Sequence, residues 1–269
     1  MKAFIKSILG YDPEANHVKS GVLGVVKAHY GCVEAQGRGT LHCHMLVWIE
    51  GGLDPNRLKE KLMRDPGGLF EQQLIAYLNQ AIQTSVPPCD ETIPPNPLDP
   101  FHPCLTRGPV QAADESNEAF ERRRKNDLSR LAEACQRHSH KATCYKLWKG
   151  PPNEKKCRFE LDESNSTTET TIDSETGEIT MQKIDGMVNN FNTSMLEAIR
   201  CNMDIKFIGS GSLAKAALYY ITDYISKSQL KLHVAFATLE TALKKIGTIN
   251  DEDDDVIVKA KKTINKMCE

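Results

Sequence analysis

The amino-acid sequence predicts an α+β domain in which helices pack on a central antiparallel sheet, with a small Cys/His zinc-binding insertion. Three observations support this prediction: two β-rich runs joined by a short glycine-containing turn, several runs with helical spacing of apolar residues, and a local cluster of cysteines and histidines. The chain has 269 residues, of which 40% are hydrophobic, enough for the core of one large domain or two small ones.

The composition excludes some classes of protein. No stretch approaches the roughly 18 apolar residues that a membrane span needs, so we expect no integral membrane protein and no membrane partner. The sequence begins without a secretory leader, and its nine cysteines are therefore expected to be reduced thiols, some of them on a metal. The net charge of −2 gives no argument for nucleic acid from the protein as a whole.

The predicted elements follow in chain order. A helix over residues 2–9 precedes a valine-rich strand over 22–34, and the turn at 37–39 joins it in a hairpin to a second strand over 40–49. The later elements are a helix beginning at Asp54-Pro55, a helix over 69–82, a Pro-rich extended connection over 86–109, a basic helix over 118–138, an acidic stretch with a hairpin around 175–177, a strand over 204–208, a helix from 209–212 to about 227 and a helix over about 230–245.

The second predicted strand carries His42 and His44 in the segment TLHCHMLVW. Side chains alternate along a strand, so both imidazoles project from one face. Two imidazoles at this spacing can bind one divalent ion. The alternative is that both are ordinary strand histidines.

A carboxylate is predicted beside this pair. If the turn is centred on Arg38, Glu34 lies opposite His42 and becomes the third ligand, with Gln36 as the alternative on the same face. Two imidazoles and one carboxylate with open positions suit Mg or Mn. The alternative for Glu34 is a cross-strand polar partner.

Tyr220 and Tyr224 lie in the predicted helical segment YYITDYISK, with Lys227 following. Residues four apart share a helix face, and Lys227 is close to that face. A tyrosine hydroxyl can attack a phosphodiester if a metal polarises the phosphate, and a lysine can neutralise its charge. The alternative is that these aromatics are core residues, as we expect for Tyr219 with Leu218 and Ile221.

Five metal-binding side chains are concentrated in residues 135–157: Cys135, His138, His140, Cys144 and Cys157. Thiolates and imidazoles form structural zinc sites, and four of these five would complete a tetrahedron. We expect His138, His140, Cys144 and Cys157 to be the ligands, because Cys135 is furthest back in the helix. The alternative is that Cys135 and His138 end a helix and the others are incidental.

The same region is basic. From Glu121 to Arg158 there are 12 Arg and Lys residues against 4 Asp and Glu, a net charge of +8, which favours the phosphates of DNA. Tyr145 and Trp148 alternate with basic residues, as in single-strand binding surfaces. The predicted DNA-binding residues are Arg122, Arg123, Arg124, Lys125, Lys146 and Lys149. The alternative is a solvated basic helix.

The histidine and tyrosine motifs, in this order, resemble the replication-initiator-like endonuclease domain of Helitron transposases, a rolling-circle family of the HUH nuclease superfamily. The resemblance runs through VLGVVKAHYGCVEAQGRGTLHCHMLVWIEGG, CRFEL, VNNFN and RCNMDIKFIGSGSLAKAALYYITDYISKS. It implies that His42 and His44 hold the divalent ion and that Tyr220 and Tyr224 cleave and transfer single-stranded DNA through a 5′-phosphotyrosine. Helitron proteins also carry a comparable Cys/His cluster. Asp223 departs from the lysine that many relatives have before the second tyrosine.

The resemblance also implies how the chain is divided into segments. We expect residues 1–85 to be the first part of the nuclease domain with the His-x-His hairpin, 86–160 a Pro-rich connection and basic Cys/His zinc-binding segment, 161–185 an exposed acidic hairpin, and 186–269 the tyrosine-helix part with C-terminal helices. No Thr-x-Asn-Pro-like motif precedes Phe4, and no GxxxxGK[ST] loop of a helicase occurs, so a truncated domain without its helicase is expected.

The implied function is metal-dependent nicking and strand transfer in Helitron transposition, in the nucleus, with activity limited by the truncation. Two alternatives remain: a non-catalytic DNA-binding remnant, and a zinc-dependent protein-interaction module.

Overall fold

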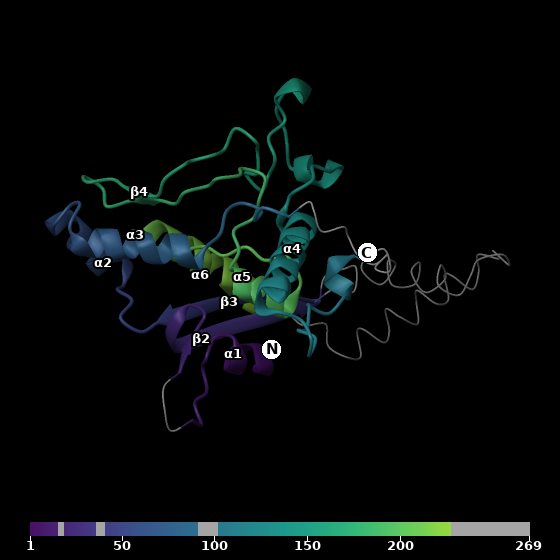
Figure 1. The fold of residues 1–269 in the computed structure, drawn as a ribbon. Helices are drawn as coiled ribbons and strands as arrows, with labels where there is room; N and C mark the ends of the chain where they lie inside the picture. Colours follow the sequence, from purple (N-terminus) through teal and green to yellow (C-terminus); the bar gives the residue numbers. More distant parts are fainter. Residues whose placement is uncertain (16–18, 36–40, 91–101, 227–269) are drawn as a thin grey trace, which may run out of the picture. The chain divides into compact units, whose positions relative to one another are not determined.

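The structure, a computed structural model, describes residues 1–15, 19–35, 41–90 and 102–226 (Figure 1). It divides into two compact units. One contains residues 1–27 and 49–211, and the other contains residues 28–48 with the chain from Ser212 onward. The second unit therefore joins the central parts of the histidine hairpin to the tyrosine helix, although nearly 170 residues separate them in the sequence.

A three-stranded sheet contains the predicted hairpin strands. Its order is β1 (Ser20–Gly21), β2 (Gly24–Ala35) and β3 (Leu41–Ile49), and β1 pairs antiparallel with β2. The backbone amide of Glu50 donates to the carbonyl of Val25 at 2.7 Å, next to the end of β3. The two predicted strands are thus confirmed, and the turn predicted at 37–39 lies outside the described residues.

The early helices are close to their predicted positions. They are α1 (Lys2–Ser7), α2 (Pro55–Arg64) and α3 (Leu69–Ala81). The side chain of Asp54 accepts hydrogen bonds from the amides of Asn56 and Arg57, which satisfies donors that the first turn of α2 leaves open. The Asp54-Pro55 pair therefore begins this helix, as predicted.

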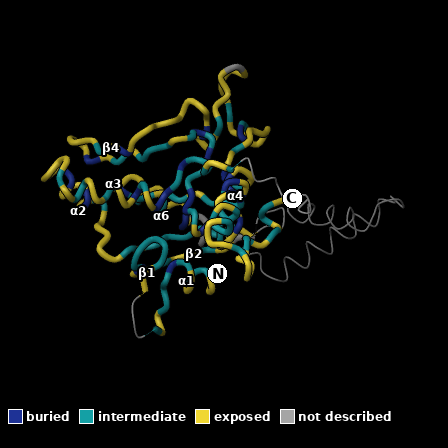
Figure 2. Tube along the Cα trace, in the orientation of Figure 1, coloured by how far each residue is buried: buried dark blue, intermediate teal, exposed yellow. Residues whose placement is uncertain are grey.

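The core of the larger unit forms between α4 (Asn117–Gln136) and α5 (Thr193–Ile199), which lie side by side in Figure 1. Figure 2 colours part of α4 as buried and part as exposed, as expected for an amphipathic helix. The core residues are Leu131, Ala132, Val188, Phe191 and Leu196. Each is completely buried, so this cluster fixes the C-terminal half of α4. Two Cys/His groups, described below, include residues at or just after the end of this helix, Cys135 and His138.

Two differences from the predicted elements concern the region after residue 190. The helix α5 was not predicted, although the side chain of Asn192 caps it by accepting from the amide of Met195. The strand predicted over 204–208 is wrong: these residues have no regular secondary structure. Ile205 donates a backbone hydrogen bond to Asn190, which fixes this stretch to the loop before α5 rather than to a sheet.

The remaining predictions are mostly confirmed. The short antiparallel pair β4 (Thr171–Ile172) and β5 (Ile179–Thr180) is the predicted hairpin, and Gly177 takes the positive φ of 67° in its turn. The helix α6 (Gly211–Ser226) is the predicted tyrosine helix. The helix predicted over 230–245 lies outside the described residues. In the part of the chain that is described, no helix is both long and apolar enough to cross a membrane.

Candidate metal centres and the tyrosine helix

The four side chains predicted to bind zinc lie together in the structure. One ligand atom from each of His138, His140, Cys144 and Cys157 lies within 4.8 Å of all the others. The Sγ of Cys144 is 3.3 Å and the Sγ of Cys157 is 3.5 Å from Nε2 of His138. Zinc–sulfur and zinc–nitrogen bonds of about 2.3 and 2.0 Å give N···S separations of about 3.5 Å in a tetrahedron. The residues therefore fit a structural zinc ion.

Local backbone contacts bring these ligands together. α4 ends at Gln136, and the amide of His138 then donates to the carbonyl of Met187 at 2.8 Å, which fixes the first ligand to the segment before α5. The short 3₁₀ helix η2 (Ala142–Tyr145) turns Cys144 back toward it. The amide of Arg158 donates to the carbonyl of Cys144 at 3.0 Å, and this bond brings the neighbouring Cys157 into the group.

The electrostatic environment suits metal binding. Burial lowers the pKa of His138, and charge on His140 and Lys141 lowers it further, so the imidazole is neutral near pH 7 and has a lone pair for a metal. The backbone amide of Lys141 donates to the Sγ of Cys144 at 3.3 Å, a bond that stabilises a thiolate. Cys144 is 2% exposed, whereas His140 is exposed, so the group lies at the edge of the buried interior.

A second Cys/His group was missed in the sequence analysis. His102, Cys104 and Cys135 each place a ligand atom within 4.8 Å of the other two. Cys135 thus belongs to this second group and not to the first. The signal was the His-x-Cys spacing of FHPCL, which lies in the stretch that we had interpreted only as a Pro-rich connection.

The strand histidines lie next to each other on β3. The ring centroids of His42 and His44 are 4.6 Å apart, with an angle of 65° between the ring planes. Among the residues that the structure describes, no third His, Cys, Asp or Glu completes a metal-sized group with them. Glu34 lies on β2, but its side chain, like all of Gln36, is outside the described residues.

Tyr220 lies beside this histidine pair. Its ring centroid is 5.0 Å from that of His44, and the two ring planes are nearly perpendicular at 84°. Both residues belong to the smaller unit, so α6 and β3 place them together within one compact part of the chain. Because Tyr220 is 52% exposed, it is not an ordinary core tyrosine.

The neighbours of Tyr220 correct part of the sequence analysis. Tyr219 is 77% and Leu218 is 58% exposed, so the prediction that they are core residues is wrong. Ile221 is 7% exposed and does face the core. The side chain of Tyr224 and all of Lys227 lie outside the described residues, although Tyr224 is four residues after Tyr220 on the same helix.

Two of the six basic residues predicted to bind DNA have structural partners. Arg123 forms an ion pair with Glu115 at 2.7 Å, and Arg124 binds both oxygens of Glu197 on α5 at 2.8 and 3.0 Å. These pairs raise the pKa of each arginine and use much of its donor capacity. The other four are exposed: Arg122, Lys125, Lys146 and Lys149.

The fold and these sites define an α+β protein with two His/Cys groups that can hold a metal such as zinc, and with a strand histidine pair next to a helix tyrosine. Residues 1–47 match the family model of the Helitron helicase-like domain at the N-terminus. The predicted resemblance to Helitron proteins is therefore confirmed over the segment that contains β2 and both strand histidines. No curated protein and no solved structure matches the chain.

Proposed function

We propose that this protein nicks single-stranded DNA and transfers the cut strand in rolling-circle transposition of the Helitron type, with Tyr220 as the attacking residue. The observation that carries the proposal is the edge-to-face contact between His44 and Tyr220, with His42 beside it. A Helitron-like domain over residues 1–47 supports a transposon-related role, and with it action on DNA in the nucleus.

The chemistry needs a hydroxyl that reaches a phosphate. The oxygen of Tyr220 attacks phosphorus, an O–P bond forms, the P–O3′ bond breaks, and the strand end leaves as a 3′ hydroxyl while the phenolic proton passes to solvent. A divalent ion such as Mg or Mn, held by His42 and His44 with Glu34 as a third ligand, would neutralise charge on the phosphate oxygens. The strand histidines thus define where the phosphate lies, and the exposed position of Tyr220 lets DNA approach.

A second tyrosine and a lysine complete the proposed site. Tyr224 follows Tyr220 by one helical turn and would attack in the same way, so that one tyrosine holds a cut strand while the other accepts the next. Lys227 comes three residues later and would balance charge on the DNA backbone.

The zinc-binding segment is proposed to support DNA binding rather than catalysis. Zinc on His138, His140, Cys144 and Cys157 would fix a loop that carries Lys146 and Lys149, both exposed. Arg122 and Lys125 on α4 add positive charge to this proposed DNA-binding surface. Arg123 and Arg124, in contrast, form ion pairs with Glu115 and Glu197 that stabilise the fold.

The test is covalent capture of DNA by the whole chain. The protein is incubated with Mn and a labelled pool of single strands of random sequence, and a protein–DNA adduct is resolved on a denaturing gel. We expect an adduct that Tyr220→Phe reduces by about 10-fold or more, because the nucleophilic oxygen is removed. The matched control is Tyr219→Phe, the exposed neighbour on the same helix, which should leave the adduct unchanged.

The same experiment separates the two alternatives. A chain that binds the DNA pool but forms no adduct is a DNA-binding remnant, and this outcome refutes the proposed reaction. A chain without salt-dependent DNA affinity is better described as a zinc-dependent interaction module. An adduct that persists in Tyr220→Phe and disappears in Tyr224→Phe would move the primary attack to the second tyrosine.

A further inference from the structure

The group formed by His102, Cys104 and Cys135 joins two distant parts of the chain. His102 and Cys104 belong to the short 3₁₀ helix η1 (Pro103–Leu105) and its N-cap, and Cys135 lies in the last turn of α4. The two sulfur atoms are 2.9 Å apart. The side chain of His102 accepts a hydrogen bond from the amide of Cys104 at 3.3 Å, which fixes the imidazole against this turn.

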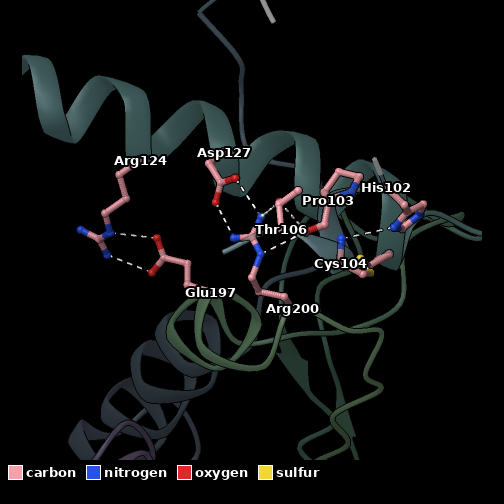
Figure 3. Close-up of polar contacts among 9 residues, drawn as sticks. His102, Pro103, Cys104, Thr106, Arg124, Asp127, Glu197 and Arg200 are labelled. Carbon is pink, nitrogen blue, oxygen red and sulfur yellow. Dashed lines mark hydrogen bonds and ion pairs between the residues drawn. The ribbon is translucent and has the colours of Figure 1, made fainter. Parts of the chain in front are cut away.

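Arg200 holds η1 against α4. Its guanidinium donates to both carboxylate oxygens of Asp127 on α4, at 2.7 and 2.9 Å. It also donates to the carbonyl of Pro103 at 3.1 Å and to the hydroxyl of Thr106 at 3.2 Å, so one buried side chain holds both elements (Figure 3). These hydrogen bonds therefore hold the segment that contains Cys104 in a fixed position next to α4.

Another cysteine, Cys201, is exposed, and it is not among the residues whose ligand atoms all lie within 4.8 Å of one another in this group. Arg200 ends α5 in the left-handed conformation, with φ of 49° and ψ of 40°, and Cys201 follows directly.

We propose that His102, Cys104 and Cys135 bind a second zinc ion, with water in the fourth position. One imidazole and two thiolates form a known zinc ligand set, in which water takes the fourth position. A tetrahedral ion would hold two thiolates about 3.8 Å apart, so Cys104 and Cys135 need to separate by only about 1 Å. Zinc replaces the protons of the thiols, which pass to solvent, and no oxidant or reductant is needed.

A disulfide between Cys104 and Cys135 is the competing arrangement. It would use both thiols and leave the imidazole of His102 without a part in the group. Zinc uses all three side chains, which explains why residues of η1, its N-cap and α4 converge. The site would fasten the Pro-rich connection to the core of the larger unit.

The first experiment counts zinc in the intact chain after purification with a reductant and without chelators. We expect about two zinc ions per chain in the parent and about one in His102→Ala or Cys104→Ser, since each variant leaves only two of the three ligands. Cys144→Ser should also reduce the count to about one, because it belongs to the first group. The matched control is Cys89→Ser, an exposed cysteine outside both groups, which should keep both ions.

His102→Ala keeps the test decisive if the cysteine variants fail to fold, because His102 is exposed and lies outside the core. Cobalt gives a second measurement: Cys144→Ser loaded with Co²⁺ should show the visible bands and sulfur charge-transfer absorption of a tetrahedral thiolate site. Those bands should disappear when Cys104→Ser is added.

Two results would overturn the proposal. One is a parent that holds a single zinc, lost in Cys144→Ser and retained in both Cys104→Ser and His102→Ala. The other is a Cys104–Cys135 cross-linked peptide recovered from protein denatured without reductant, with two fewer titratable thiols than the reduced chain. Neither outcome would affect the proposed DNA reaction, since that is measured by the Tyr220-dependent adduct.

Discussion

His44 on β3 and Tyr220 on α6 form an edge-to-face pair, with ring centroids 5.0 Å apart. The contact explains how a tyrosine that is half exposed keeps a defined position: its ring contacts the strand histidine while about half of the residue remains accessible. A ring restrained in this way loses less freedom when its hydroxyl meets a phosphate, which is the main requirement for in-line attack. The pair is therefore the centre of the proposed nicking site.

The first prediction concerns the strand histidines. Changing both His42 and His44 to Ala should abolish Mn-dependent adduct formation and weaken Mn binding about 100-fold, because two of the three proposed ligands are lost. The fold should be retained, since neither side chain belongs to the buried core. Binding is measured by calorimetry with Mn and folding by circular dichroism. His29→Ala on β2 is the matched control. If the double variant binds Mn like the parent, the site assignment is wrong.

The second prediction concerns zinc removal. A strong chelator should release metal from His138, His140, Cys144 and Cys157 and loosen the loop that they close. Hydrogen exchange should then rise at the amide of Arg158, which is bonded to the carbonyl of Cys144. Exchange at the amide of Leu196, within α5, serves as the internal control and should stay slow. Unchanged exchange at Arg158 in metal-free protein would show that the segment holds itself together without zinc.

The third prediction is a pH dependence of metal retention. Burial and then charge on His140 and Lys141 lower the pKa of His138, so protons compete with zinc for this imidazole only below the ordinary histidine range. Zinc should be retained at pH 7 and lost as the pH falls below about 6, since each ligand must be deprotonated to bind. Elemental analysis after desalting at a series of pH values measures the midpoint. A midpoint above pH 7 would contradict the environment seen around His138.

The fourth prediction tests the role of Arg200. Arg200→Gly should lower the free energy of unfolding by about 2–3 kcal/mol, because a buried guanidinium with two bonds to Asp127 is lost. Glycine is chosen because it accepts the left-handed backbone at this position, so the change reports the side chain and not strain. Urea titration gives the value. Arg122→Ala, which removes an exposed arginine on α4, should change it by less than about 0.5 kcal/mol.

The parts of the fold that sequence analysis predicted well are those with a local signal. Asp54 caps α2 through its own side chain, and alternation on β3 places the rings of His42 and His44 together. The four residues of the first His/Cys group could be chosen because they lie within one short window, and Cys135 was set apart by its place in the helix. Each of these predictions rests on spacing between near neighbours.

The features that were missed depend on contacts between distant segments. His102 and Cys104 lie some 30 residues before Cys135, and only the frame held by Arg200 brings them together. The partner of Arg124 is Glu197, far along the chain, so this arginine, which we predicted to bind DNA, forms an ion pair within the fold. Nothing in local spacing or composition encodes such pairings, since they follow from how α4 packs on α5.

The last prediction concerns DNA binding by Lys146 and Lys149, in the proposed zinc-binding segment. Lys146 and Lys149 are exposed on either side of Trp148, whose indole donates to the carbonyl of Pro151 at 3.0 Å and so gives the loop a fixed shape. If both lysines contact phosphates, changing them to Ala should reduce the slope of log affinity against log salt by about 1.4 for single strands, at about 0.7 per contact. Fluorescence anisotropy with a labelled single strand, at salt concentrations from about 50 to 200 mM, measures the slope.

The control for this experiment removes the same charge elsewhere. Lys59 and Arg64 are exposed on α2, outside the basic segment, and Ala at both positions keeps a good helix former. Because counterions are released only where side chains meet phosphates, this pair should leave the salt slope within about 0.3 of the parent. Equal slopes for the two double variants would mean that net charge, and not the zinc segment, governs DNA affinity. The basic residues around Trp148 would then be a solvated surface, and the DNA path would have to be sought elsewhere.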